Sequence, residues 1–240
     1  MTFHPASPLS LAAFLAVVAA VVLFFVGALH HVAKKNGQPE REATRTALKA
    51  LFLIIAWNGI VSAVVGRGWI EGAIFPRLPL LFLTLNLMGL LFAFSRFGTT
   101  LAAGVPWTVL MAFQGFRLPL ELVLHSWAGQ GTIPETMTWT GQNWDVLTGV
   151  IALIGALLAA RLPSIRRALA WAVNGIGFVL LLNVGRVAML SSPLPFAWKV
   201  EPPLLLAVHV PYVWIGSVCV AGALAGHVIL TRALLLRKPS

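Results

Sequence analysis

Charged side chains are scarce in this sequence. Asp, Glu, Lys and Arg together make up 10% of its 240 residues, and hydrophobic residues make up 59%, whereas charged residues reach about 25% in ordinary soluble domains. A soluble fold cannot bury that much apolar surface, so the composition excludes a soluble enzyme, a coiled coil and a disordered chain. We expect an all-α, polytopic transmembrane helical bundle that forms a single domain over residues 1–240.

Cysteine and acidic residues are also scarce. The single cysteine, Cys219, excludes an intrachain disulfide and a cysteine-rich metal site. Seven acidic residues against 17 basic ones leave a formal net charge of +10. In a soluble chain this excess would indicate nucleic acid binding, but here the positions of the basic residues explain it through membrane topology, and no nucleic acid partner is expected.

Apolar runs, in contrast, are long and frequent. A membrane-spanning helix needs about 20 mostly apolar residues. Seven runs meet this requirement, and they cover roughly 9–32, 46–66, 76–95, 103–127, 145–161, 167–190 and 203–231. The run at 145–161 is the shortest, so a six-helix bundle in which this segment is re-entrant is the alternative.

The basic residues are distributed unevenly between the two sets of alternating loops. Cytoplasmic loops carry an excess of Lys and Arg, which predicts an outside N-terminus and a cytoplasmic C-terminus, with membrane lipid as the expected partner. One set holds 12 basic residues and the other holds Arg67, Arg77 and Lys199. The 12 are Lys34, Lys35, Arg41, Arg45, Lys49, Arg96, Arg161, Arg166, Arg167, Arg232, Arg237 and Lys238.

The fourth run carries a polar stripe. Ionisable residues inside a span are costly and mark a functional site by default. At 100° per residue the stripe occupies an arc of about 80° and extends about 16 Å along the helix. Pro119 lies within it and is expected to kink the helix. The stripe consists of Gln114, Arg117, Glu121 and His125.

Other polar residues have a similar predicted depth in the neighbouring spans. We therefore expect an outward-facing polar pocket that binds a small polar or amphiphilic ligand or an ion, for transport or sensing. Arg117 would hold an anionic group, and Glu121 would act as a proton-responsive carboxylate. The remaining candidate residues are His125, Asn143, Asp145, Asn183, Arg186, His209 and Tyr212.

An intramembrane enzyme is an alternative for the same residues. Glu121 or Asp145 would act as general acid or base, and His125 and His209 would act as bases or as ligands of a hydrolytic metal ion. The depth of these two histidines would also permit haem binding. The sequence contains no HExxH or comparable motif, so it predicts no particular metal and assigns no cofactor.

A structural or assembly subunit is a further alternative. In that case Arg117 would pair with Glu121 one turn away, and Arg186 would pair with Asp145 to hold two helices together. The histidines of the cytoplasmic half, His30, His31 and His227, are expected at helix ends, where the headgroup region solvates them.

Two segments form a recognisable pattern together. They are FRLPLELVLH at Phe116–His125 and MTWTGQNWDVLTG at Met137–Gly149. They resemble a group of small, uncharacterised bacterial integral membrane proteins, in which an Arg–Glu helix is followed by an outer loop of the type M-T-x-x-G-x-N-x-D. The resemblance covers mainly residues 110–232 and implies a bacterial inner-membrane location but no known activity. The matching residues are Arg117, Glu121, Thr138, Gly141, Asn143 and Asp145.

Overall fold

The computed structural model describes residues 2–236, and its secondary structure within that range is helical. The long helices are α1 (Pro8–Lys35), α2 (Glu40–Gly66), α3 (Ile74–Phe94) and α8 (Arg166–Ser191). The shorter ones are α4 (Arg96–Gly104), α5 (Trp107–Phe113), α6 (Arg117–Gly129), α7 (Val146–Arg161) and α9 (Ala221–Leu236). A 3₁₀ turn at Gln114–Phe116 joins α5 to α6, and a π-helical turn at Ile215–Val220 leads into α9.

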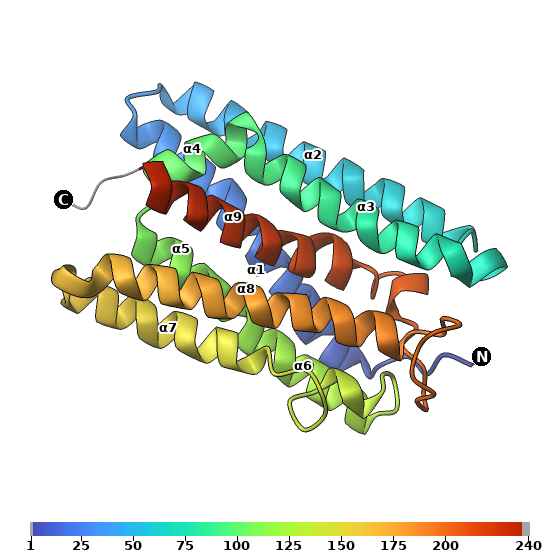
Figure 1. Cartoon of the computed structure of the whole chain (residues 1–240). Coiled ribbons are helices and arrows are strands. Elements are labelled where there is room, and N and C mark those ends of the chain that lie inside the picture. Colours follow the sequence, from blue (N-terminus) through green and yellow to red (C-terminus); the bar gives the residue numbers. More distant parts are fainter. Residues whose placement is uncertain (1, 237–240) are drawn as a thin grey trace.

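The all-α prediction is confirmed, and six of the helical segments are long and apolar enough to cross a membrane. The segment at 145–161 becomes α7, an apolar helix of 16 residues that is shorter than the other six. It lies alongside α8 over most of its length (Figure 1). The six long segments are Pro8–Lys35, Glu40–Gly66, Glu71–Phe94, Trp107–Gly129, Pro163–Ser191 and Ile215–Leu236.

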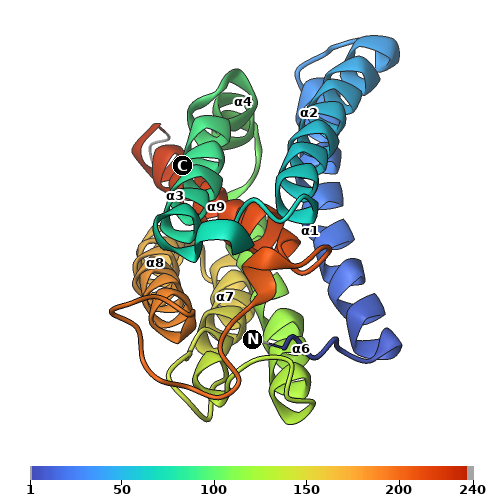
Figure 2. The ribbon, with the colours of Figure 1, turned by 90° about the vertical axis from the view of Figure 1, so that its right-hand side faces the viewer.

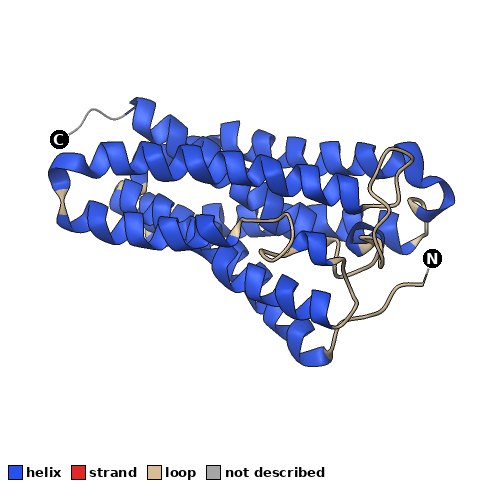
Figure 3. Cartoon of the chain, turned by 60° about the horizontal axis from the view of Figure 1, so that its bottom comes forward, coloured by secondary structure: helices blue, strands red, loops and turns tan. Residues whose placement is uncertain are grey.

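The chain runs back and forth along the bundle, and α1 begins at the opposite end from the one where α9 ends (Figure 1). We call the end that holds the α1–α2 turn, α4 and the α7–α8 turn the basic end, because Lys34, Lys35, Arg96 and Arg161 lie there. The opposite end, which holds the longer connections, is the loop end (Figure 3). Arg237 and Lys238, which were expected with the basic group, lie outside the described residues.

The fourth run departs from regular α-helical geometry just before Pro119, where a kink was expected. Its α-helical hydrogen bonding gives way to the tighter turn at Gln114–Phe116. Proline lacks an amide hydrogen, and its ring collides with the carbonyl group four residues earlier, which here belongs to Gly115. The break therefore falls at the position that Pro119 disturbs, and it leaves Arg117 as the first residue of α6.

Helix α9 lies near the centre of the bundle when it is viewed end-on (Figure 2), and its span is the most buried of the six. Helix α3 approaches α9 closely, since a Cβ atom added to Gly89 would lie 2.6 Å from the carbonyl oxygen of Ala221. Helix α7 approaches α6 in the same way, because a Cβ atom on Gly149 would lie 2.6 Å from the backbone nitrogen of Leu118. Glycine at these crossings brings the helices that carry polar residues into direct contact.

Candidate functional site

Arg117 is the centre of a buried polar cluster. Its side chain is 1% exposed. Nη1 donates to Asp145 Oδ1 at 2.6 Å and to the Gly177 carbonyl oxygen at 3.1 Å, while Nη2 lies 3.1 Å from His227 Nε2. One guanidinium group thus joins the start of α6 to the start of α7, to α8 and to α9.

The hydrogen bonds around His227 define which ring nitrogen carries the hydrogen. The Thr231 hydroxyl donates to the His227 carbonyl oxygen, so it accepts from the Asn174 amide at 2.7 Å. The Asn174 carbonyl oxygen is then left to accept from His227 Nδ1 at 2.9 Å. Because Nδ1 donates, the unprotonated Nε2 accepts from Arg117, and the imidazole is neutral in this arrangement.

Glu121 lies one turn beyond Arg117 on α6 and is bound by Asn143. The Asn143 amide nitrogen is 2.9 and 3.1 Å from the two carboxylate oxygens of Glu121 and also donates to the Met137 carbonyl group. The Asn143 side-chain oxygen accepts from the backbone N–H of Asp145. Asn143 therefore folds the 135–145 loop onto the same cluster.

The 135–145 loop is compact because of one glycine and two hydroxyl groups. A Cβ atom on Gly141 would collide with the carbonyl oxygen of Glu135, so the turn requires glycine at this position. The Thr138 hydroxyl donates to the same carbonyl oxygen. The Thr148 hydroxyl, in the first turn of α7, donates to Asp145 Oδ1 at 2.8 Å. The glycine turn and these two hydroxyl hydrogen bonds thus hold Asp145 opposite Arg117.

A cavity of about 100 Å³ borders this cluster. Arg117, Glu121 and Asp145 form part of its wall, and apolar side chains form most of the rest. Asp145 is paired with Arg117, whereas Glu121 has no cation within ion-pair distance among residues 2–236. The apolar part of the wall comes from α3, α8 and the segment before α9, with Leu81, Leu85, Leu181, Val184, Leu206 and Val213 among its residues.

The two predicted histidines of the loop end do not join the cluster. His125 is exposed and stacks on Trp139 with ring centroids 4.2 Å apart. His209 stacks on Phe3 at 3.9 Å. Within residues 2–236 no three His, Cys, Asp or Glu side chains come close enough together to hold a metal ion. His125 and His209 are therefore not brought together with Glu121 or Asp145 as a ligand set in the described part of the chain.

The predicted ion-pair partners of the two arginines within the spans, Arg117 and Arg186, were wrong. Arg117 forms its ion pair with Asp145, and Glu121 instead accepts a hydrogen bond from Asn143. The reason is that the folded 135–145 loop brings Asn143 and Asp145 against α6. Arg186 is exposed and donates to Asn183 within its own helix.

Two further candidates bind backbone groups rather than members of the cluster. The Asn183 amide donates to the carbonyl group of Gln142. The Tyr212 hydroxyl accepts from a backbone N–H of the N-terminal segment at 2.9 Å. The structure thus brings four of the nine candidate residues together, namely Arg117, Glu121, Asn143 and Asp145.

The expectation that His227 lies solvated at a helix end was wrong. Its side chain is buried and contacts Arg117. The expected span began at residue 203, whereas the helical segment begins at Ile215, so His227 lies near the middle of that segment rather than near its end. His227 and Thr231 are one turn apart and so share a helix face. This spacing, together with the polar Asn174 on the preceding helix, could have revealed that His227 faces the interior of the bundle.

The comparisons with known proteins return no relative. No protein-family model, curated protein or solved structure matches the chain. The functional argument therefore rests on the chemistry of the site.

Proposed function

We propose that this chain is a membrane ligand-binding protein, of the transport or sensing type, whose cavity beside α6 takes a small amphiphilic cation. The observation that carries the proposal is the position of Glu121. This carboxylate is buried, borders the cavity and has no ion-pair partner among the described residues.

The charges around the cavity favour a cation over an anion. Two carboxylates, Glu121 and Asp145, face one guanidinium, that of Arg117. Arg117 already donates to Asp145, to the Gly177 carbonyl group and to His227. An anionic ligand would add a third negative group to a weakly solvated region, whereas an ammonium group would balance Glu121 and donate to it.

The size and lining of the cavity favour a short apolar tail. A cavity of about 150 Å³ lined by apolar side chains accepts benzene, and this one measures about 100 Å³. Butylamine has its charge at one end and an apolar remainder of four carbon atoms, fewer than the six of benzene. Its ammonium group would reach Glu121 while its tail lies against Leu85 and Leu181.

We further propose that the protein lies in a bacterial inner membrane with the loop end outside. The concentration of basic residues at the opposite end supports this orientation. The proposed kinship with small bacterial membrane proteins is supported by contact between its two matching segments, since Asn143 binds Glu121 and Asp145 binds Arg117. The cavity would then be accessible from the outer half of the membrane.

Thermal unfolding of the full-length protein in a neutral detergent tests the binding proposal. Butylamine is expected to raise the Tm, while butanol and butanoate at equal concentration are not. Glu121→Gln keeps the side-chain shape and an acceptor for Asn143, and it should abolish the shift. Glu135→Gln is the matched control on the exposed part of the loop, and it should respond like the unmodified protein.

A second variant covers the case in which Glu121→Gln does not fold. Ala188→Leu narrows the cavity from α8 and leaves Glu121 in place, so it should also remove the butylamine shift. The proposal is contradicted by an equal shift with butanol, by a full shift in folded Glu121→Gln, or by no shift with butylamine. An unaltered shift in folded Ala188→Leu would show that the amine binds elsewhere.

A further inference from the structure

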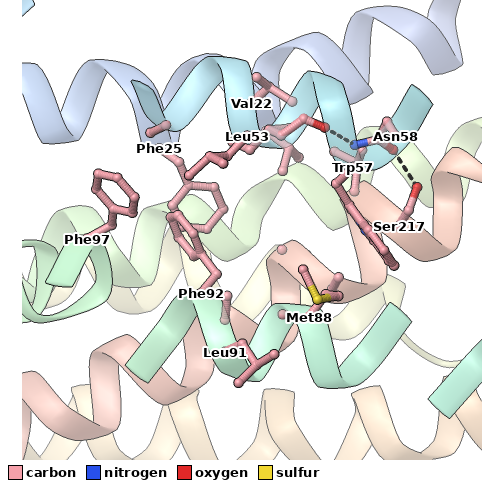
Figure 4. A pocket seen from close by; sticks show the side chains of 18 of the residues that line it. Val22, Phe25, Leu53, Trp57, Asn58, Met88, Leu91, Phe92, Phe97 and Ser217 are labelled. Carbon is pink, nitrogen blue, oxygen red and sulfur yellow. Dashed lines mark hydrogen bonds between the residues drawn. The ribbon is translucent and has the colours of Figure 1, made fainter. Parts of the chain in front are cut away.

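A second, larger cavity lies between α2 and α3, away from Glu121. It measures about 300 Å³, and α1 and α9 form its floor. Figure 4 shows the apolar side chains that border it, with Asn58 and Ser217 joined by a hydrogen bond at one end. The labelled lining residues are Val22, Phe25, Leu53, Trp57, Asn58, Met88, Leu91, Phe92, Phe97 and Ser217.

This groove faces the surroundings of the bundle between two helices. Figure 2 shows α2 standing apart from α3. Leu53 on α2 is 54% exposed, and Leu91 on α3 is 55% exposed. Since both helices are long and apolar enough to span a membrane, the groove opens toward hydrocarbon rather than water.

A basic stripe continues the groove toward the basic end of the molecule. Arg41, Arg45 and Lys49 follow one another at every fourth residue of α2 and so share one helix face. They line a wide surface depression together with Leu53 and Phe97, the two residues that also line the groove. Cations and apolar wall therefore form one continuous surface.

No acidic side chain among residues 2–236 forms an ion pair with the cations of the stripe. The ion pairs among residues 2–236 use Lys34, His30 and Arg117, and none uses a member of the stripe. Glu40, one residue before Arg41, is held by Lys34 at 2.9 Å and by His30 at 3.0 Å. The stripe thus presents three exposed positive charges that the described protein does not neutralise.

We propose that this surface binds one anionic phospholipid, with the phosphate on the stripe and an acyl chain in the groove. A phospholipid carries its charge next to the glycerol group and its apolar chains beyond it. The stripe and the groove follow the same order along α2, since Lys49 precedes Leu53 by one turn, or about 6 Å. Basic clusters at the cytoplasmic ends of spans attract anionic lipids in this way.

Native mass spectrometry of the full-length protein, with phosphatidylglycerol or phosphatidylcholine added in detergent, tests the proposal. One phosphatidylglycerol per chain should be retained in preference to phosphatidylcholine. The variant R45Q/K49Q should weaken this retention about 25-fold, since each basic residue near the surface contributes about a factor of five. The control K35Q/R161Q removes the same charge from exposed positions outside the groove and should leave retention unchanged.

A groove variant separates this site from general attraction between charges. Val22→Phe adds a phenyl ring to the groove and leaves the stripe intact, so the retention of phosphatidylglycerol should fall. Glycerol phosphate, which has no acyl chain, should bind measurably to neither the unmodified protein nor this variant. Equal retention of the two lipids would overturn the proposal. An equal loss in both charge variants, or full retention in folded Val22→Phe, would also overturn it.

Discussion

Arg117 is a buried cation whose donors reach acceptors on three other segments of the chain, namely Asp145, the Gly177 carbonyl group and His227. Lysine could not replace it, because an ammonium group lacks the planar fork that spans acceptors in different directions. The side chain thus provides both the charge that Asp145 requires and the geometry that joins four helices.

Replacing Arg117 by Met should destabilise the protein by about 3–5 kcal/mol, because Asp145 would remain buried without its cation. The double variant R117M/D145N removes both charges and should recover part of this loss. Thermal unfolding in detergent gives the comparison. Arg186→Met, an exposed site in α8, should change stability by less than about 0.5 kcal/mol; a double variant no more stable than R117M would contradict the pairing.

The sequence predicted part of the site because the residues concerned are local to two segments. Arg117 and Glu121 share a helix face, and Asn143 and Asp145 follow in the next loop, so their depth in the membrane could be estimated. His227 was missed because its depth depends on where α9 begins, and without it the polar Asn174 on α8 had no evident partner. An irregular segment and a π turn occupy the residues before Ala221, and hydropathy alone does not separate such turns from helix.

At the scale of elements, the crossings of α3 with α9 and of α7 with α6 depend on glycine. The Gly89 position faces backbone atoms of Ala221, which cannot move aside as a side chain would. The paths of these helices are therefore determined by single small residues. Hydropathy predicted the existence of α3 and α9, but it carries no information on which faces of the two helices meet.

Gly89→Ala should destabilise the bundle by about 1–3 kcal/mol, the usual cost of overpacking. Gly27→Ala is the matched control in α1, where an added Cβ atom meets nothing within 4 Å. Alanine favours helices by up to about 1 kcal/mol over glycine, so the control should be neutral or slightly stabilising. Thermal unfolding of the two variants side by side provides the measurement, and equal destabilisation would show that the α3–α9 crossing is not the cause.

At the scale of the whole molecule, the two cavities lie in different parts of the bundle. The smaller one lies beside the buried cluster of α6 and includes Met137 from the loop end, while the larger one lies between α2 and α3 and continues to the basic end. The composition predicted a helical membrane protein, and the distribution of basic residues predicted which loops lie at the same end of the bundle. The lateral groove could not be predicted, because the separation of α2 from α3 depends on how complete helices pack.

Cysteine labelling tests the proposed orientation. In a Cys219→Ala background, Gln38→Cys marks the basic end and Glu135→Cys marks the loop end, and both positions are exposed. A membrane-impermeant maleimide added to intact cells should label Glu135→Cys, and it should label Gln38→Cys only after the cells are opened. The reverse pattern would refute an outside N-terminus.

The bonds from Asn174 to His227 and Thr231 also limit which motions the bundle can make. Sliding α9 along α8 by one turn, about 5.4 Å, would bring Ala223 or Thr231 to the place of His227, and neither carries an imidazole for Arg117. Helices α8 and α9 consequently have a single register in which these hydrogen bonds and the contact with Arg117 can form. A conformational cycle would have to move α6 to α9 as one rigid block, with the displacement taken up by the helices around it.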